Sequence, residues 1–379
     1  MSETVWIIAG ETSGDGYGAR LAAELWRKRP ELVVRGMGGP AMAKAGVDIM
    51  IDSSELGVVG LVEVFRHIFT FIRIFQQLVR RASKERPDVV VLIDYPGFNL
   101  RFAKRLHALG IRVVWYISPQ VWAWKRGRIH KLAAYVDKML AIFPFEPEVY
   151  AEVDLDVSFI GHPLLEELEE GRDPELVRDP DTVLLLPGSR RMELARLLPD
   201  LVRTAAILKQ KHPSLTFVMP LPRPTTRDLA LKMLDELRGT EKLPDIQVEV
   251  GTTRMWMQRA GTGLAATGTV TVEAAILGVP LVTVYRVNWL VAKLARLIVR
   301  LDYATMVNII GGREIFPERV QEDMTVPKLV EAMESILPGG ARREETLTGM
   351  RETVATLGGN VPASARVAQC VLEQIDRSE

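Results

Sequence analysis

The sequence is poor in cysteine and has no excess charge of either sign. Its single cysteine, Cys370, excludes an intramolecular disulfide and a metal site built from several cysteines. The 48 lysines and arginines balance the 48 aspartates and glutamates, so we expect no nucleic-acid partner. No cluster of histidine, cysteine and aspartate has the spacing of metal ligands, and we expect neither a metal nor a cofactor.

Long apolar runs are scarce as well. The amino terminus has an apolar run over residues 5–9 and no basic start, which predicts a first strand rather than a signal peptide. Similar β-branched runs alternate with helical segments in two series, which predicts an α/β fold with two doubly wound parallel sheets. The runs cover residues 5–9, 32–35, 89–93, 113–117, 139–143 and 157–160, then 183–186, 215–219, 246–250, 263–266 and 281–285.

The length of 379 residues favours two domains. We place one Rossmann-like domain at residues 1–165 and a second at residues 166–325. Residues 326–379 are expected to form helices that pack back on the first domain or on a partner subunit. Ligands of such folds gather beyond the carboxyl ends of the strands, so the residues that follow each apolar run are the candidates for chemistry.

The segment 183–199, VLLLPGSRRMELARLLP, joins a buried strand to a helix through a turn. Gly188 allows the turn, and Ser189, Arg190 and Glu193 open the helix, whose free N–H groups and positive dipole end favour an anion. The alternative is an ordinary connection in which Arg190 is a solvated surface charge.

A second turn of this kind follows the run at residues 263–266. Gly268 and Thr269 open a helix whose N–H groups can receive a pyrophosphate, and Glu273 can accept hydrogen bonds from ribose hydroxyls. Alternatively, Glu273 only complements the helix dipole. The two turns together indicate a nucleoside diphosphate site in the second half of the chain.

The first strand is followed by GETSGDGYG, in which Ser13 and Asp15 are candidates for acceptor binding or for lining the cleft. The glycines permit a close approach of the backbone to a ligand. A dinucleotide site is the rival interpretation, but the spacing is not GxGxxG and no acidic residue ends the second strand. In the plainest alternative, the glycines form a tight turn and Asp15 caps the following helix.

Asp94 ends the most apolar strand, where partial burial would raise its pKa and suit it to accept a proton. Its alternative role is to cap a helix or to pair with a basic neighbour. After the next strand come Gln120, Trp122, Trp124 and a basic pair at 125–126, which together could stack on a sugar and hold an anionic group. One of the two tryptophans is expected to fill core space instead.

The chain resembles the lipid-A-disaccharide synthase family of GT-B glycosyltransferases over nearly its whole length. The resemblance rests on GETSGD at 10–15, IDYPGFN at 93–99, SPQVWAW at 118–124, FPFE at 143–146, IGHP at 160–163, LLPGSR at 185–190 and GTVTVE at 268–273. The family's PN-L segment is replaced by MVNI at 306–309, which keeps Asn308.

The resemblance implies an inverting transfer of 2,3-diacylglucosamine from its UDP form to 2,3-diacylglucosamine 1-phosphate, giving a β(1→6) disaccharide phosphate and UDP. Asp94 would take the acceptor proton, with Asp15 as the other candidate. The two turns of the second half would hold UDP, and Asn308 would add a contact. Because the turn at residues 187–190 supplies no obvious acceptor for the proton of the 6-hydroxyl, the base would come from the other domain, and chemistry would depend on closure of the cleft.

Acylated substrates imply contact with a bilayer, and two segments have the composition for it. Residues 58–79 are apolar but carry charges, so they favour an interfacial helix in which Ile68, Phe69, Phe71 and Ile72 meet lipid. Residues 287–301 combine Trp289 and Leu290 with basic residues. We expect a peripheral protein on the cytoplasmic face of the inner membrane. Both segments could instead lie in the core or contact the second subunit of a homodimer.

Two other functions remain open at this stage. A UDP-N-acetylglucosamine 2-epimerase-like enzyme would share the fold and the nucleotide site but would need no membrane contact. A non-catalytic binder of sugar nucleotides or lipids would bind both substrates without turnover.

Overall fold

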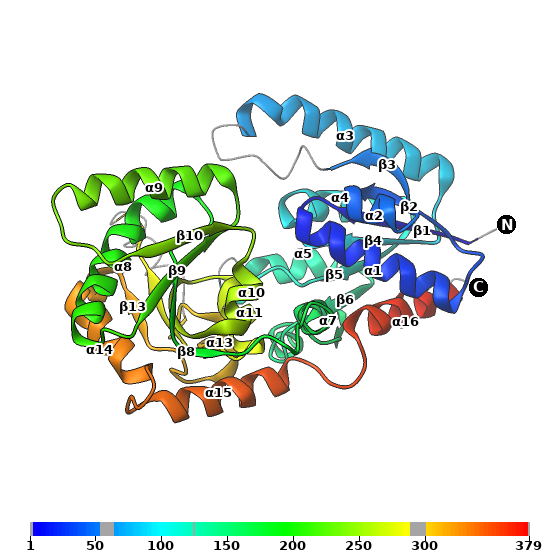
Figure 1. The fold of residues 1–379 in the computed structure, drawn as a ribbon. Coiled ribbons are helices and arrows are strands. Elements are labelled where there is room, and N and C mark those ends of the chain that lie inside the picture. Colours follow the sequence, from blue (N-terminus) through cyan, green and yellow to red (C-terminus); the bar gives the residue numbers. More distant parts are fainter. Residues whose placement is uncertain (1–2, 54–63, 124–125, 289–300, 378–379) are drawn as a thin grey trace. The chain divides into compact units, whose positions relative to one another are not determined.

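The computed structural model describes residues 3–53, 64–123, 126–288 and 301–377, without the side chains of residues 64–68 and 126. The chain forms two compact units, Met1–Glu166 with Leu357–Glu379, and Glu167–Thr356. Each unit is a parallel sheet with helices on both faces (Figure 1). The predicted fold class, two doubly wound sheets with helices at the carboxyl end, is confirmed.

The first sheet has the strand order β3-β2-β1-β4-β5-β6-β7. Its central strands are buried on both faces, which explains why their sequences are continuously apolar rather than alternating. The strands are β1 (Thr4–Ala9), β2 (Val33–Gly38), β3 (Asp48–Asp52), β4 (Val89–Ile93), β5 (Arg112–Tyr116), β6 (Lys138–Ala141) and β7 (Asp156–Phe159).

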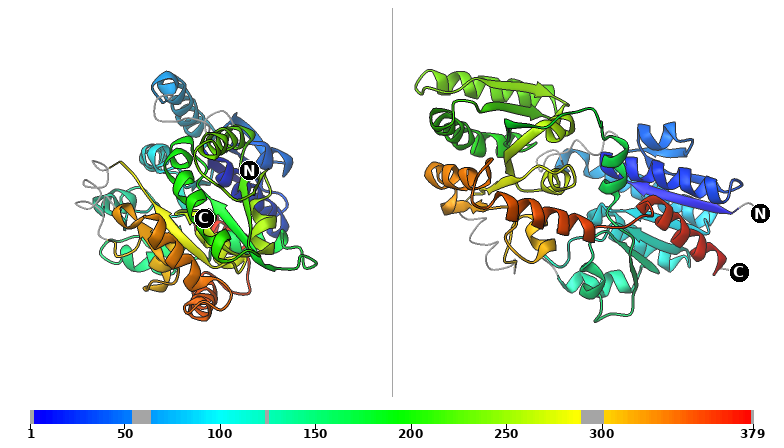
Figure 2. Two further views of the ribbon diagram at one scale, coloured as in Figure 1. Left: turned by 60° about the vertical axis from the view of Figure 1, so that its left-hand side comes forward. Right: turned by 60° about the horizontal axis from the view of Figure 1, so that its bottom comes forward.

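Helices cover the first sheet in two layers. Side chains of α3 (Val64–Glu85), α4 (Pro96–Ala108) and α5 (Ile129–Ala133) share one core with the sheet. On the other face, α1 (Thr12–Lys28) contacts α16 (Ala363–Asp376), so the end of the chain completes the first unit (Figure 2). The shorter helices are α2 (Pro40–Lys44), α6 (Glu146–Val149) and α7 (Pro163–Glu170), together with the 3-10 turn at Arg126–Arg128.

The second sheet has the order β10-β9-β8-β11-β12-β13, and α8, α9 and α14 share a core with it. Its strands are β8 (Asp179–Leu186), β9 (Thr216–Leu221), β10 (Ile246–Val250), β11 (Ala260–Ala266), β12 (Leu281–Tyr285) and β13 (Glu318–Val320). Its helices are α8 (Arg191–Lys211), α9 (Pro224–Arg238), α10 (Thr253–Arg259), α11 (Thr269–Ile276), α13 (Met306–Gly311), α14 (Val326–Ile336) and α15 (Arg343–Thr356).

Every predicted apolar run overlaps a strand of the structure, but strands β3 and β13 were not predicted. Both are edge strands, and the side chains of β3 are intermediate or exposed. Strand β13 has only three residues, and none of them is fully buried. Neither strand therefore carries the continuous apolar signal on which the prediction depended.

The strand order reverses once in each sheet, between β1 and β4 and between β8 and β11. At such a switch point the two following segments diverge to opposite faces, which leaves a crevice at the carboxyl edge. The register pairs Ala9 with Ile93 and Leu186 with Ala265, so the two loops of each pair start side by side. Four of the predicted candidate segments follow these four strands.

Truncation of Phe102 tests how α4 packs against α3. Its buried ring lies 6.1 Å from the rings of Phe75 and Phe98. We expect Phe102→Ala to lower the free energy of unfolding by about 3–5 kcal/mol, because it leaves a cavity under both helices. Urea denaturation followed by circular dichroism measures this. Arg101→Ala, at an exposed position of the same helix, is the control. Equal midpoints for the two variants would contradict this packing.

Candidate functional site

The first switch point brings the segment after β1 against the segment after β4. A Cβ atom on Gly10 would lie 2.4 Å from Cδ1 of Tyr95, so only glycine permits this approach. Asp94 and Tyr95 both have left-handed backbones, with φ of 45° and 50°. Asp94 N–H donates to the Tyr116 carbonyl at 2.9 Å, and Nδ2 of Asn99 donates to the Asp94 carbonyl at 2.7 Å. These bonds hold a backbone conformation that is strained for residues other than glycine.

The turn places the Asp94 carboxylate in a largely desolvated position. Burial, assisted by the negative charge of Glu11, raises its pKa from 3.8 to about 6, against a hydrogen bond from the Tyr95 backbone. A carboxylate with this pKa is ionised at neutral pH and still basic enough to accept a proton. Asp94 therefore has the property expected of a general base.

Asp15 is a structural cap for a neighbouring helix. It is 4% exposed, and its two oxygens accept hydrogen bonds from the backbone N–H groups of Gly39 (2.7 Å), Ala41 (2.8 Å) and Met42 (3.0 Å) at the start of α2. The alternative that Asp15 caps the helix after β1 is wrong, because α1 already begins at Thr12. Ser13 lies exposed in the first turn of α1.

The segment after β5 is tied to a carboxylate that the sequence analysis did not assign. Gln120 is exposed, whereas the indole Nε1–H of Trp122 donates to Oε1 of Glu146 at 3.3 Å. Trp122 also packs edge-on against Phe145, with ring centroids 5.1 Å apart. The available signal was an acidic residue inside the apolar FPFE segment directly after a strand. Trp124 lies outside the described residues.

The turn after β8 leads into α8 through Gly188, Ser189 and Arg190. Gly188 has φ of 104°, and a Cβ there would lie 2.6 Å from Oε2 of Glu193. Glu193 accepts the Arg190 backbone N–H at 3.3 Å, so its carboxylate caps α8. Ser189 is exposed, and the Arg190 side chain is 82% exposed and touches Glu193 at 3.3 Å. Arg190 can therefore reach an anion from the start of α8.

The turn after β11 opens α11. Gly268 has φ of 145°, and both Gly268 and Thr269 are exposed. Glu273 lies one turn further on, and its Oε1 accepts a hydrogen bond from Nη2 of Arg254 at 2.7 Å. No hydrogen bond from another described residue reaches Oε2 of Glu273.

Asn308 is fully buried, and its amide is used inside the protein. Its Nδ2 donates to the Phe316 carbonyl and to Glu318, both at 2.8 Å. Its Oδ1 accepts the backbone N–H groups of Ile315 and Phe316 at 2.9 and 2.8 Å. These four bonds use both donors and both acceptor positions of the amide. Asn308 therefore positions the segment before β13 rather than presenting a free group to a ligand.

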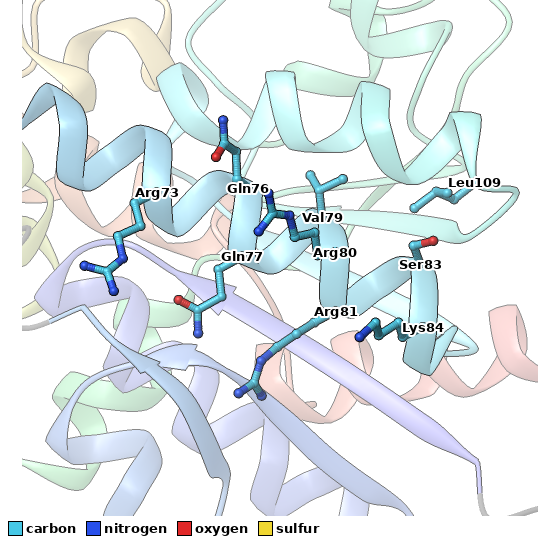
Figure 3. A pocket seen from close by; sticks show the side chains of 9 residues that line it. All are labelled: Arg73, Gln76, Gln77, Val79, Arg80, Arg81, Ser83, Lys84 and Leu109. Atoms are coloured by element: carbon cyan, nitrogen blue, oxygen red, sulfur yellow. The ribbon is translucent and has the colours of Figure 1, made fainter.

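Helix α3 has an apolar inner face and an exposed outer face. Phe69 is 79% exposed and Ile72 is 47% exposed, whereas Phe71 packs against the core of the first unit. A groove of about 630 Å³ along α3 is lined by Arg73, Arg80, Arg81 and Lys84, together with Gln76, Gln77, Val79, Ser83 and Leu109 (Figure 3). None of the four cations pairs with another described residue. The side chain of Ile68, and residues Trp289 and Leu290, lie outside the described part.

Two negative observations concern the described residues alone. None of their helices combines the length and apolarity needed to cross a bilayer. They also contain no group of three or more histidine, cysteine, aspartate or glutamate side chains placed to hold a metal ion.

The cap formed by Asp15 leads to a test of stability. We expect Asp15→Ala to lower the free energy of unfolding by about 3 kcal/mol, because it leaves three N–H groups at the start of α2 without their charged acceptor. Urea denaturation measures the change. Ser13→Ala, at an exposed position of the same segment, should have no effect beyond about 0.5 kcal/mol. A stable Asp15→Ala protein would count against the cap.

Comparison with known proteins places the chain in a family. A family model described as Lipid-A-disaccharide synthetase matches residues 5–371. The lipid-A-disaccharide synthase of Myxococcus xanthus is 37% identical over 376 residues, covering 97% of each chain. That of Koribacter versatilis is 40% identical over 387 residues, covering 99% of each chain.

Among solved structures, the UDP-GlcNAc 2-epimerase of Neisseria meningitidis bound to UDP-GlcNAc has a TM-score of 0.65 at 12% identity. The match covers 99% of this chain and 100% of that chain, and at this identity it shows a shared fold. The family model and the two synthases match nearly the whole chain, and they show its family as well as its fold. The chain belongs to the lipid-A-disaccharide synthase family, whose members are glycosyltransferases of lipid A biosynthesis.

Proposed function

We propose that the chain transfers 2,3-diacylglucosamine from UDP-2,3-diacylglucosamine to 2,3-diacylglucosamine 1-phosphate, giving a β(1→6) disaccharide 1-phosphate and UDP. The observation that carries the proposal is the Asp94 carboxylate, whose pKa is raised to about 6 at the switch point of the first unit. The second unit offers a complementary feature, because Arg190 and two helix starts lie at its own switch point. Such a site suits a diphosphate.

In the proposed reaction, Asp94 accepts the proton of the acceptor 6-hydroxyl as that oxygen attacks the anomeric carbon of the donor. The bond from this carbon to the UDP oxygen breaks, UDP leaves with the electron pair, and the configuration inverts. Arg190 and the backbone N–H groups of Gly268 and Thr269 stabilise the negative charge that grows on UDP. Glu273 binds the ribose through its open oxygen.

Other polar residues of the proposed site act by holding the backbone. Glu193 caps α8 beneath Arg190, and Asn308 fixes the segment before β13. Asp15 caps α2, and all three of its bonds would be weakened if it took up a proton. For this reason we propose Asp94, rather than Asp15, as the base. Ser13 and Gln120 are exposed and available to the acceptor.

The epimerase alternative has less support than the transferase. The epimerase structure shares only the fold with this chain, at 12% identity, whereas the synthases reach 37% and 40% over nearly the full length. A binder without activity would be excluded by turnover. Release of UDP that requires the acylated acceptor would separate the transferase from both alternatives.

The base proposal predicts a pH profile and a variant. We expect kcat/KM to fall about tenfold per pH unit below pH 6, because protonated Asp94 cannot accept the acceptor proton. Asp94→Asn should lower turnover by roughly 100-fold or more while leaving UDP affinity within about twofold. UDP release and calorimetric titration with UDP measure the two quantities. Unchanged turnover would reject Asp94 as the base.

Glu11 provides a matched control for this profile. Its negative charge contributes to the raised pKa of Asp94. In Glu11→Gln the fall in kcat/KM should therefore move towards lower pH without the loss of turnover seen in Asp94→Asn. A profile that stays in place would show that another group titrates.

We further propose that the chain attaches peripherally to the cytoplasmic face of the inner membrane through α3. The exposed side chains of Phe69 and Ile72 would enter the interface, and the four cations of the groove would meet anionic headgroups. Phe71 is not among the proposed membrane contacts, because it packs inward against the core of the first unit. A homodimer formed through this face is the competing explanation.

Vesicle sedimentation tests this attachment. Replacing Arg73, Arg80, Arg81 and Lys84 with Gln should weaken binding to phosphatidylglycerol-containing vesicles at least tenfold, since each cation contributes about 1 kcal/mol at an anionic surface. Arg101→Gln with Arg105→Gln, exposed on α4, is the control. Binding that is unchanged would contradict the proposal. A shift from dimer to monomer in the quadruple variant would favour the homodimer.

A further inference from the structure

The proposed reaction leaves one buried carboxylate without a role. Glu146, at the start of α6, is fully buried. Its Oε2 accepts the backbone N–H groups of Ile142 (3.1 Å) and Phe143 (3.0 Å), and its Oε1 accepts the Trp122 indole N–H at 3.3 Å. A buried charge with three donors links the segment after β6 to the segment after β5.

The linked segment continues towards the proposed catalytic turn. Residues 118–122 follow β5, and the Tyr116 carbonyl at the end of that strand accepts the Asp94 backbone N–H at 2.9 Å. Ile117 has a left-handed backbone with φ of 71°, and its carbonyl accepts the Trp115 indole N–H at 3.0 Å. The exposed Gln120 is therefore carried on a short segment that is held at one end by β5 and at the other by Glu146.

Protonation of Glu146 would weaken this link. The carboxylate accepts all three hydrogen bonds, and protonation turns part of its acceptor capacity into an O–H donor that faces N–H groups. The bond to Trp122 is the longest of the three and would be lost first. The hydrogen-bond donors lower the pKa of Glu146, but burial has the larger effect and raises this pKa from 4.5 to about 7.

The neighbours of Glu146 keep their charge states near this pH. Ser118 and Tyr150 face it and share a hydrogen bond of 2.8 Å, and burial raises the pKa of the Tyr150 phenol above its usual value. His162 packs against Phe143, with ring centroids 5.2 Å apart, and burial lowers its pKa to about 4. Glu146 is thus the member of this group that changes charge near neutral pH.

We propose that Glu146 is a positioning residue that, when ionised, holds residues 118–122 in the form that binds the acceptor and, when protonated, releases them. The proposal rests on the proposed function in one respect, namely that this segment contacts the acceptor. It does not depend on which residue is the base.

Acceptor binding in an Asp94→Asn background tests the proposal, because turnover cannot occur without the donor and this background removes the titration of Asp94. The probe is 2,3-diacylglucosamine 1-phosphate, whose phosphate titration is common to all variants and cancels in their ratio. With Glu146 intact, affinity should fall between pH 8 and pH 6. Adding Glu146→Gln should weaken acceptor binding roughly tenfold at pH 8. At pH 6, the proteins with and without this substitution should bind the acceptor with the same affinity.

Two matched variants accompany the test. Glu148→Gln alters an exposed carboxylate of the same helix and should leave the profile unchanged. Trp122→Phe keeps an aromatic ring against Phe145 but removes the indole donor, so binding should weaken at pH 8 even if Glu146→Gln fails to fold. An affinity ratio between the parent and Glu146→Gln proteins that stays constant from pH 8 to pH 6 would overturn the proposal. The proposal would also be overturned if a folded protein with Trp122→Phe bound the acceptor at pH 8 as tightly as its Asp94→Asn parent.

Discussion

The pairing of β1 with β4 in the first unit, and of β8 with β11 in the second, is the constraint that brings the candidate segments of each unit together. Parallel strands that pair in register end at the same edge, so the loops after them begin as neighbours. Because the strand order reverses at these pairs, the following helices cover opposite faces and the loops are not buried beneath them. The approach of Tyr95 to Gly10 is a direct consequence in the first unit.

Several polar residues in or beside the recognisable motifs hold backbone groups. Asp15 and Glu193 cap helices, Asn308 saturates its amide on the segment before β13, and Glu146 gathers three N–H groups. Buried N–H groups at helix starts and loop ends need acceptors, and these side chains supply them. Arg190, which is proposed to bind UDP, is a side chain that remains exposed beside this network.

Helix α3 has an inward-facing and an outward-facing set of apolar side chains. Phe71, Phe75 and Leu78 turn inward and anchor the helix on the core, whereas Phe69 and Ile72 remain outside. A helix with one buried stripe can expose its remaining apolar side chains without losing its place in the fold. The adjoining row of cations, which have no acidic partner among the described residues, is consistent with contact to an anionic surface.

The sequence by itself determined the α/β class, the central strands and the loops that carry the candidates, because strands buried on both faces must be continuously apolar. It could not reveal β3 or β13, whose edge positions leave them partly exposed. Only the tertiary structure decided that Asp15 caps α2, that Asn308 is saturated and that Glu146 holds Trp122. Each of these roles depends on a donor far away in sequence or on a local turn, and residue type alone does not specify which N–H group a carboxylate or amide will meet.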